Sequence, residues 1–139
     1  MKRYNVADFL LSAVLLLAQN LAAEDLPYVQ HENIVFAEVH GTGLLADVFT
    51  PANPSPDLPG HGLGIVDIAS GAFYSDRGKI DDHKKAKMYD IYCAQGYTVF
   101  AIRPGSITKY TGMEMNENVK TGIRWVKSQA ATYGVDPDR

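Results

Sequence analysis

The feature that most constrains the fold is the order of two short apolar runs, each followed by a segment with helical periodicity. Residues 64–68 and 98–102 are mostly apolar, which is typical of strands covered on both faces in a parallel sheet. Helical patterns are expected over about 81–95 and 114–133. Strand, helix, strand, helix is the order of a parallel α/β sheet with helices on both faces, so the sequence predicts an α/β fold.

Each expected helix has an apolar face and a glycine at its end. In the first helix, Ala86, Tyr89 and Cys93 share one face, and Gly96 follows as the terminating residue. In the second helix, apolar residues recur at spacings of four, three, four and three, which places them in one stripe. The members of this stripe are Val119, Ile123, Val126, Ala130 and Tyr133. Both helices are therefore expected to pack on the sheet through these faces.

A β-hairpin is expected before the first parallel strand. Residues 34–39 and 44–49 are strand-like, and glycines at both ends of 41–43 favour a tight turn between them. The next segment, 50–60, contains four prolines, so it cannot join a central ladder and is expected at the surface. The full order predicted is a hairpin followed by a parallel β-α-β-α unit.

Residues 1–23 are expected to be a secretory signal peptide. Two basic residues precede an apolar run at 9–18, and small residues follow at 22–23. The run is shorter than the roughly 20 residues that span a bilayer, so no membrane anchor is expected. Residues 24–139 are predicted to be exported, to the periplasm or the outside of the cell.

The composition excludes some classes of protein. A net charge of −3 and the absence of a basic stripe argue against a nucleic-acid partner, which needs cations facing the phosphates. The glycines at 60, 62 and 64 precede a strand, whereas a dinucleotide-binding loop follows one. Cys93 is the only cysteine and is expected in the core. The sequence has four histidines, His31, His40, His61 and His83. Their spacing is not that of metal ligands, so they are interpreted as surface residues. Neither a metal nor a cofactor is expected.

Four segments together resemble the α/β-hydrolase superfamily, in its esterase and lipase branch with hormone-sensitive-lipase-like and feruloyl-esterase-like enzymes. They are the strand 64–68 after a hairpin, the loop 69–73, the strand 97–103 that ends in arginine, and 119–139. The last segment contains Gly122-Ile123-Arg124-Trp125-Val126 and ends in Asp136-Pro137-Asp138-Arg139. The resemblance implies the N-terminal half of an α/β-hydrolase domain, within residues 24–139.

The resemblance places the family's oxyanion loop directly after the strand 64–68. It implies that the backbone amides of Gly71 and Ala72 form the oxyanion hole, although a plain strand-to-helix connection is an equal alternative. Phe73 and Tyr74 are candidates for a substrate-pocket wall, with capping of the core as the alternative.

Two charged features of the sequence have structural interpretations. Asp76 and Arg77 are expected to form a surface ion pair that fixes the loop. Arg103 is expected to have a structural role, pairing with a carboxylate or capping the sheet.

The family's nucleophile is not found in the sequence. In the family a G-x-S-x-G elbow follows the next strand, and no serine here has glycines two positions before and after it. The resemblance therefore implies the N-terminal part of an exported serine hydrolase acting on small-molecule acyl or carbohydrate esters. It is expected to be inactive as written, because the catalytic triad would follow residue 139. The alternative is an exported, non-catalytic α/β binding module.

Overall fold

The protein's structure is a computed structural model that describes residues 26–139. The predicted signal peptide, residues 1–23, lies outside the described residues. Four strands form one sheet in the order β1-β2-β4-β3. They are β1 Tyr28–Val39, β2 Thr42–Pro51, β3 Gly64–Ile68 and β4 Thr98–Arg103. β2 is antiparallel to both of its neighbours, and β3 runs parallel to β4, which confirms the predicted hairpin and parallel pair.

The hairpin turn follows from local backbone chemistry. His40 and Gly41 both have positive φ, at 50° and 66°, as a two-residue turn between twisted strands requires. Val39 pairs with Thr42, so the turn lies one residue earlier than the sequence pattern predicted. The glycine supplies the left-handed conformation without strain, and the hairpin register is fixed from there.

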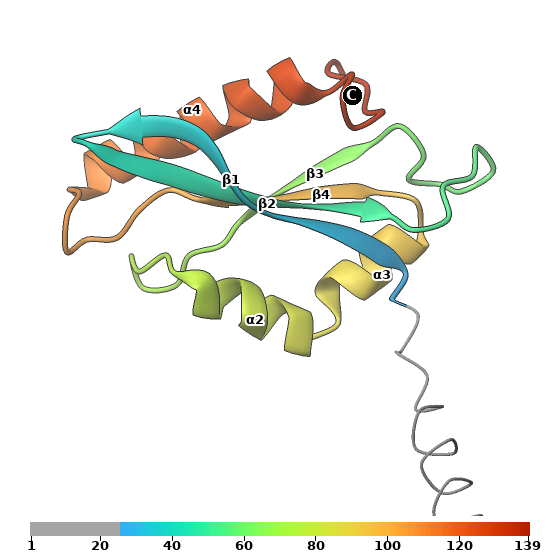
Figure 1. Ribbon diagram of the computed structural model, residues 1–139, viewed down its shortest axis with the longest axis horizontal. Helices are drawn as coiled ribbons and strands as arrows, with labels where there is room; N and C mark the ends of the chain where they lie inside the picture. Colours follow the sequence, from blue (N-terminus) through green and yellow to red (C-terminus); the bar gives the residue numbers. More distant parts are fainter. Residues whose placement is uncertain (1–25) are drawn as a thin grey trace, which may run out of the picture.

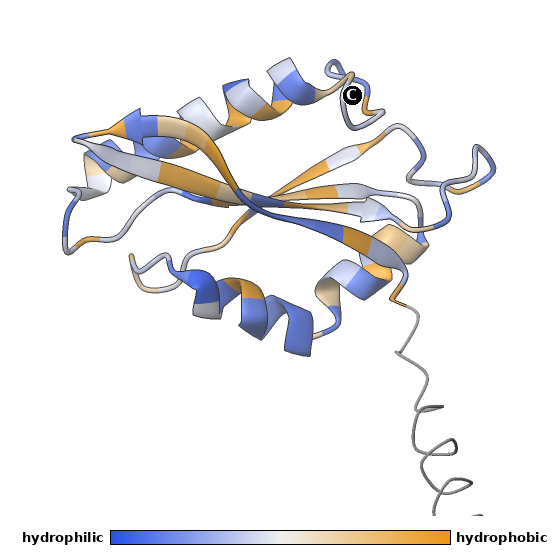
Figure 2. Ribbon diagram, viewed as in Figure 1, coloured by the Kyte–Doolittle hydropathy of each residue, from blue (hydrophilic) through white to orange (hydrophobic). Residues whose placement is uncertain are grey.

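Helices cover both faces of the sheet. α2, Arg77–Lys85, and α3, Met88–Ala94, lie on one face, and α4, Gly112–Gln129, lies on the other (Figure 1). Apolar residues are concentrated in the strands and on the inner sides of the helices (Figure 2). The predicted α/β fold with its β-α-β-α unit is thereby confirmed.

The first predicted helix is two helices. The sequence pattern predicted one helix over 81–95, but the chain leaves the helix after Lys85, and Lys87 adopts a left-handed φ of 57°. This break turns α3 so that Tyr89 and Cys93 are buried against the sheet, whereas Ala86, predicted on the same face, is exposed. The predicted start of the helix, at about residue 81, was also wrong. Helix α2 begins at Arg77 and has no acidic residue in its first turn, so the acidic pair at 81–82 does not mark the helix start.

The last predicted helix begins earlier and ends earlier than the pattern indicated. Thr111 caps it, with its side chain accepting from the Glu114 amide at 3.3 Å and its own amide donating to Glu114 at 2.7 Å. This reciprocal capping box fixes the start of α4 at Gly112, and the helix ends at Gln129 rather than at Tyr133. Tyr133 still packs edge-on against Phe100 from the turn that follows.

The two faces of the sheet bury separate apolar clusters. Under α4 the cluster includes Phe36, Val48, Phe100, Ile102 and Val126. Under α2 and α3 it includes Tyr28, Phe49, Ile80, Tyr89 and Cys93. Cys93 is 1% exposed, which confirms its predicted place in the core, and burial followed by the nearby Asp90 charge raises the pKa of its thiol to about 12. The thiol is therefore neutral at physiological pH.

The cap of α4 should make the start of this helix sensitive to acid. The Thr111 amide, the Thr111 hydroxyl and then His40 hydrogen-bond to the Glu114 carboxylate and lower its pKa from 4.5 to about 2. Because the folded-state pKa is depressed, this contribution is present above about pH 4.5 and is lost as the pH falls through 2. Unfolding monitored from pH 6 to pH 2 should show Glu114→Gln with less acid dependence than the wild-type chain. Equal slopes for the two proteins would contradict the assignment.

Candidate functional site

Two loops lie together at the carboxyl ends of the parallel strands. Residues 69–76 follow β3 and residues 104–111 follow β4. The Ile107 amide donates to the Phe73 carbonyl at 2.9 Å, and the Ser75 amide donates to the Ser106 hydroxyl at 2.9 Å. Open α/β sheets bind ligands at this edge, so these connected loops form the candidate site.

The loop after β3 contains a tight turn made by two non-glycine residues. Gly71 and Tyr74 exchange backbone hydrogen bonds at 2.8 and 2.9 Å. Between them, Ala72 and Phe73 have φ values of 49° and 64°. Positive φ is uncommon for residues with a Cβ, and such strained backbone occurs preferentially at functional sites. This turn has no signal in the sequence, because neither alanine nor phenylalanine favours a positive φ.

The turn distinguishes between the two expected oxyanion donors. The Gly71 amide already donates to the Tyr74 carbonyl, so it can reach a substrate oxygen only if this hydrogen bond opens. The Ala72 amide has no hydrogen-bond partner within residues 26–139. In this conformation Ala72 is therefore the residue of the pair whose N–H is available.

Large apolar side chains surround the loop and face solvent. Phe73 is 64% exposed and Tyr74 is 48% exposed, so neither caps the core. Ile68, the last residue of β3, and Ile107, from the loop after β4, are exposed to a similar degree. Sequence reasoning missed both isoleucines, because only the fold brings residues from the two loops to one edge. The four side chains form the apolar border of the site.

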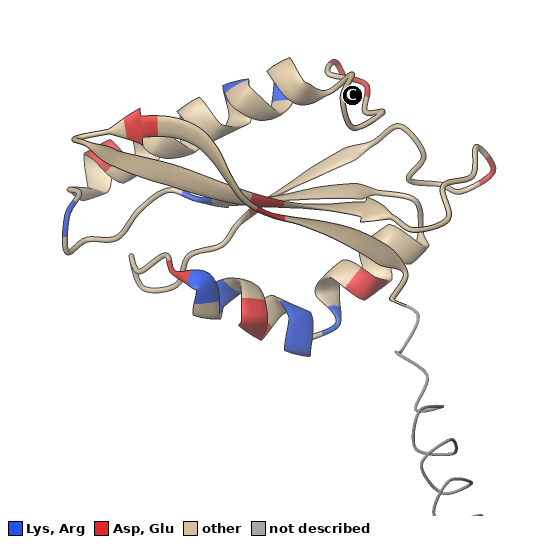
Figure 3. Ribbon diagram, in the orientation of Figure 1, with Lys and Arg blue, Asp and Glu red and all other residues tan. Residues whose placement is uncertain are grey.

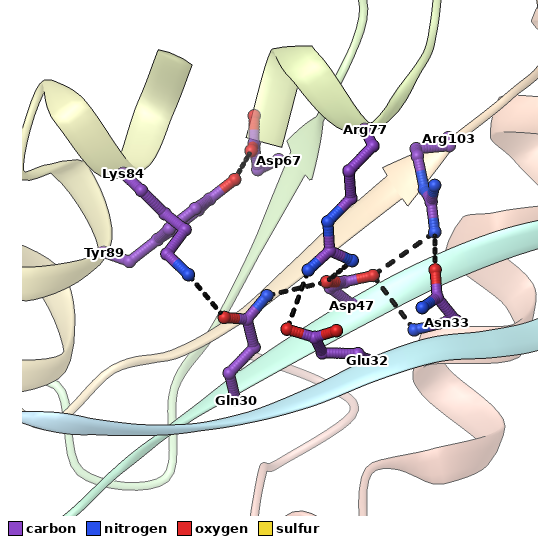
Figure 4. A network of polar contacts seen from close by, with 9 residues as sticks. All are labelled: Gln30, Glu32, Asn33, Asp47, Asp67, Arg77, Lys84, Tyr89 and Arg103. Atoms are coloured by element: carbon purple, nitrogen blue, oxygen red, sulfur yellow. Dashed lines mark hydrogen bonds and ion pairs between the residues drawn. The ribbon is translucent and has the colours of Figure 1, made fainter. Parts of the chain in front are cut away.

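A buried carboxylate connects this loop to the sheet. Asp47, in the middle of β2, is fully buried, and Figure 3 shows acidic residues near the centre of an otherwise mostly uncharged sheet. Its carboxylate accepts from Arg77 Nη1 at 2.8 Å and from Arg103 Nη2 at 3.3 Å (Figure 4). Gln30 Nε2, at 2.7 Å, and the Asn33 amide, at 3.1 Å, also donate to it. Asp47 thus connects β1, β2, β4 and α2.

The ion pairs of Arg77 and Arg103 test the roles that the sequence predicted for these two arginines. Arg103 pairs with Asp47 and also donates to Asn33 Oδ1 at 2.7 Å, which confirms its expected structural role. The expected surface pair of Asp76 with Arg77 was wrong, because Arg77 turns inward to Asp47 and also pairs with Glu32 at 2.7 Å. A buried carboxylate needs cationic partners, and this requirement outweighs the weak attraction of an exposed neighbour.

Electrostatics differ at the two guanidinium groups. Burial lowers the pKa of Arg103, because its side chain lies deep beside the sheet. Burial also acts downward on Arg77, but the facing carboxylates of Asp47 and Glu32 raise its pKa overall. Since Arg77 is the first residue of α2, its ion pair with Asp47 fixes the end of the loop 69–76 to the centre of the sheet.

A second polar cluster lies on the α2 and α3 side of the sheet. Asp67 in β3 accepts from His83 Nδ1 and from the Tyr89 hydroxyl, both at 2.8 Å. The sequence pattern predicted His83 to be a surface residue. Instead it is hydrogen-bonded to Asp67 and joins α2 to β3. Tyr89 is fully buried, and burial followed by the Asp67 charge strongly raises its pKa. This cluster fastens both helices to the sheet.

The hollows of the surface are distributed along the sheet. A cavity of about 250 Å³ lies at the candidate site, beside the loop after β4. A larger one, about 600 Å³, lies at the opposite ends of the parallel strands, near Gly62 and Thr98. A small hollow of about 100 Å³ lies between β3 and α4 and is lined in part by Ile123, which is 39% exposed although it was predicted to pack. Beside this hollow, the outer edge of β3 has no strand partner within the described residues.

No group of three or more His, Cys, Asp or Glu side chains within residues 26–139 could hold a metal ion. None of the helices in that range is long and apolar enough to cross a membrane.

Comparison with solved structures finds esterases. A truncated form of a carbohydrate esterase from gut microbiota matches 83% of this chain and 38% of its own, with 22% identity and a TM-score of 0.64. Esterase B from Lactobacillus rhamnosis matches 94% of this chain and 42% of its own, at 15% identity and a TM-score of 0.61. A thermophilic esterase from the planctomycete Thermogutta terrifontis matches 76% and 36%, at 23% identity and a TM-score of 0.61.

The chain spans about two fifths of the length of these esterases. No protein-family model and no curated protein matches the sequence. The likeness is therefore one of architecture, and it confirms the fold that the resemblance implied. The described residues therefore have an α/β fold that these esterases share over part of their length.

Proposed function

We propose that this chain is the N-terminal part of an exported serine esterase acting on carboxylic esters of acyl or carbohydrate type. The observation that carries the proposal is the loop 69–76 at the carboxyl end of β3, which is an edge strand of the sheet ordered β1-β2-β4-β3. A further strand beside β3 would end next to this loop. A serine at the tip of that strand would then lie close to the Ala72 amide.

In this proposal the residues after β3 bind and polarise the ester, and residues beyond Arg139 attack it. Ala72 supplies an amide for the developing oxyanion, and Gly71 supplies a second when its turn opens. Phe73 and Tyr74 form one wall of the substrate pocket, with Ile68 and Ile107 beside them. Without the nucleophile, the acid and the histidine, residues 24–139 would not turn over an ester.

Support for an esterase comes from the three solved structures named above, each of which is an esterase. Support for export comes from the leader at residues 1–23, which has basic, apolar and small residues in the order of a signal peptide.

The test begins with the coding sequence after Arg139. We expect a strand and a G-x-S-x-G motif within about a dozen residues, because the elbow follows one strand of ordinary length. The protein so completed, expressed with its leader and recovered from the exported fraction, should hydrolyse p-nitrophenyl acetate.

Two variants serve as controls in that assay. Alanine in place of the elbow serine should abolish turnover, and residues 24–139 alone should show none. Absence of turnover by the completed, folded protein would defeat the esterase proposal. If no elbow follows and residues 24–139 melt cooperatively and reversibly, the non-catalytic binding module is the correct interpretation.

A further inference from the structure

The cavity of about 250 Å³ at the candidate site has a distinctive chemical lining. It lies between the start of β2, the end of β4 and the loop 104–111, and Ser75 from the loop after β3 forms part of its wall. Its lining contains two cations, Arg103 and Lys109, together with several hydroxyl groups and no carboxylate. The cavity therefore offers positive charge and hydrogen-bond donors beside the loop that carries Ala72.

The two cations are not equally neutralised. The charge of Arg103 is balanced by Asp47, and its Nε–H, which has no hydrogen-bond partner within the described residues, is buried away from the cavity. Lys109 makes no ion pair there: its ammonium group donates to the Thr42 hydroxyl and lies 6.0 Å from the centre of the Tyr110 ring. The nearest acidic side chain along the chain, Glu114, is engaged with Thr111 and His40. Lys109 thus leaves uncompensated positive charge at the cavity.

Some of the hydroxyl groups near the Lys109 ammonium group already make hydrogen bonds within the protein, and others do not. Ser106 donates to the Ser75 carbonyl and accepts from the Ser75 amide, so these two residues mainly fix the wall. Thr108 also lines the cavity, and its hydroxyl has no hydrogen bond within residues 26–139. The Lys109 ammonium group and the free Thr108 hydroxyl can both donate to a carboxylate, and the ammonium group makes the stronger, charge-assisted hydrogen bond.

We propose that this cavity binds a carboxylate group of the substrate, so that the enzyme acts on esters whose acid or alcohol part carries a second, free carboxylate. The inference rests on the proposed esterase function for its biological meaning, but the binding itself does not require catalysis. The volume is below the roughly 300 Å³ at which pockets for whole small molecules begin, and it suits one charged group with its neighbouring atoms. The apolar border at Phe73 and Tyr74 is left for the rest of the ester.

The test is a titration of the ¹⁵N-labelled chain with sodium glucuronate, followed by NMR at constant ionic strength. Glucose, which has the same ring without the carboxylate, is the matched ligand. Glucuronate should give saturable shift changes in the amides of residues 42–45 and 103–110, and glucose should give none. Lys109→Gln should weaken glucuronate binding by about tenfold or more, because a charge-assisted contact is lost.

Two further variants separate the site from a general charge effect. Lys109→Arg keeps the cation and should retain most of the affinity. Lys127→Gln removes an exposed cation from the last turn of α4, away from the cavity, and should change nothing. Equal binding of glucose and glucuronate, absence of binding, or an unaltered affinity in Lys109→Gln would each overturn the inference.

The outcomes also separate this inference from the esterase proposal. Glucuronate binding at these residues, together with no ester turnover by the completed protein, would leave the carboxylate site standing and remove the catalytic function. Ester turnover by the completed protein, together with no glucuronate-dependent shifts, would support the esterase function and remove the carboxylate site.

Discussion

Replacing Asp47 with alanine should lower the free energy of unfolding by about 3–5 kcal/mol, which is the range for removing one partner of a buried ion pair. The substitution leaves Arg103 with only 11% of its side chain exposed and with its carboxylate removed. It also leaves the Asn33 amide without its acceptor. Arg77 is less affected, because it retains Glu32 and is one third exposed. Urea denaturation should show a lower midpoint with an unchanged slope.

Asp57→Ala is the matched control for this prediction. Asp57 is exposed, and the hydrogen bond recorded for it comes from its backbone amide, which alanine retains. Its substitution should change stability by less than about 0.5 kcal/mol. If both variants lose the same stability, the Asp47 network does not hold the sheet together in the way described.

The same variant has a local consequence at the candidate site. Arg77 begins α2 directly after the loop 69–76, so the loss of its buried partner releases one end of that loop. Under conditions where Asp47→Ala remains folded, the amides of this loop should exchange with solvent faster than in the wild-type chain.

Replacing Phe49 with alanine should cost a comparable amount, about 3–5 kcal/mol, through the lost contacts and the cavity left behind. The Phe49 ring is fully buried between two tyrosines, with its centre 3.8 Å from that of Tyr89 in a stacked arrangement and 5.2 Å from that of Tyr28 edge-on. Because Tyr89 also donates to Asp67, a loosened ring there weakens the attachment of α3 to the sheet. Thermal or urea unfolding measures the effect.

Phe73→Ala provides the comparison, since it removes the same side chain from a position that is 64% exposed. Its effect on stability should stay within about 0.5 kcal/mol. A large loss of stability in Phe73→Ala would show that this ring packs against something, and it would then be a poor candidate for the substrate-pocket wall.

The sequence by itself determined the elements whose signals are local. The hairpin turn, the two parallel strands, the burial of Cys93 and the last helix each follow from residue types within a few positions of one another. Alternation, helical spacing and turn chemistry depend on the chain's own backbone geometry, so they can be read without knowing what packs where. The resemblance then supplied the architecture, and the fold agrees with it.

Only the tertiary structure decided the polar contacts and the shape of the site. Asp47 lies in a predicted apolar strand, and its partners Arg77 and Arg103 are 30 and 56 residues away. Arg77 turns inward to Asp47 and His83 pairs with Asp67, and these groups become neighbours only when the sheet forms. The break at Lys87 likewise turns Tyr89 and Cys93 toward the sheet. A buried charge takes whichever partner the fold brings near, and distance along the sequence carries no information about that choice.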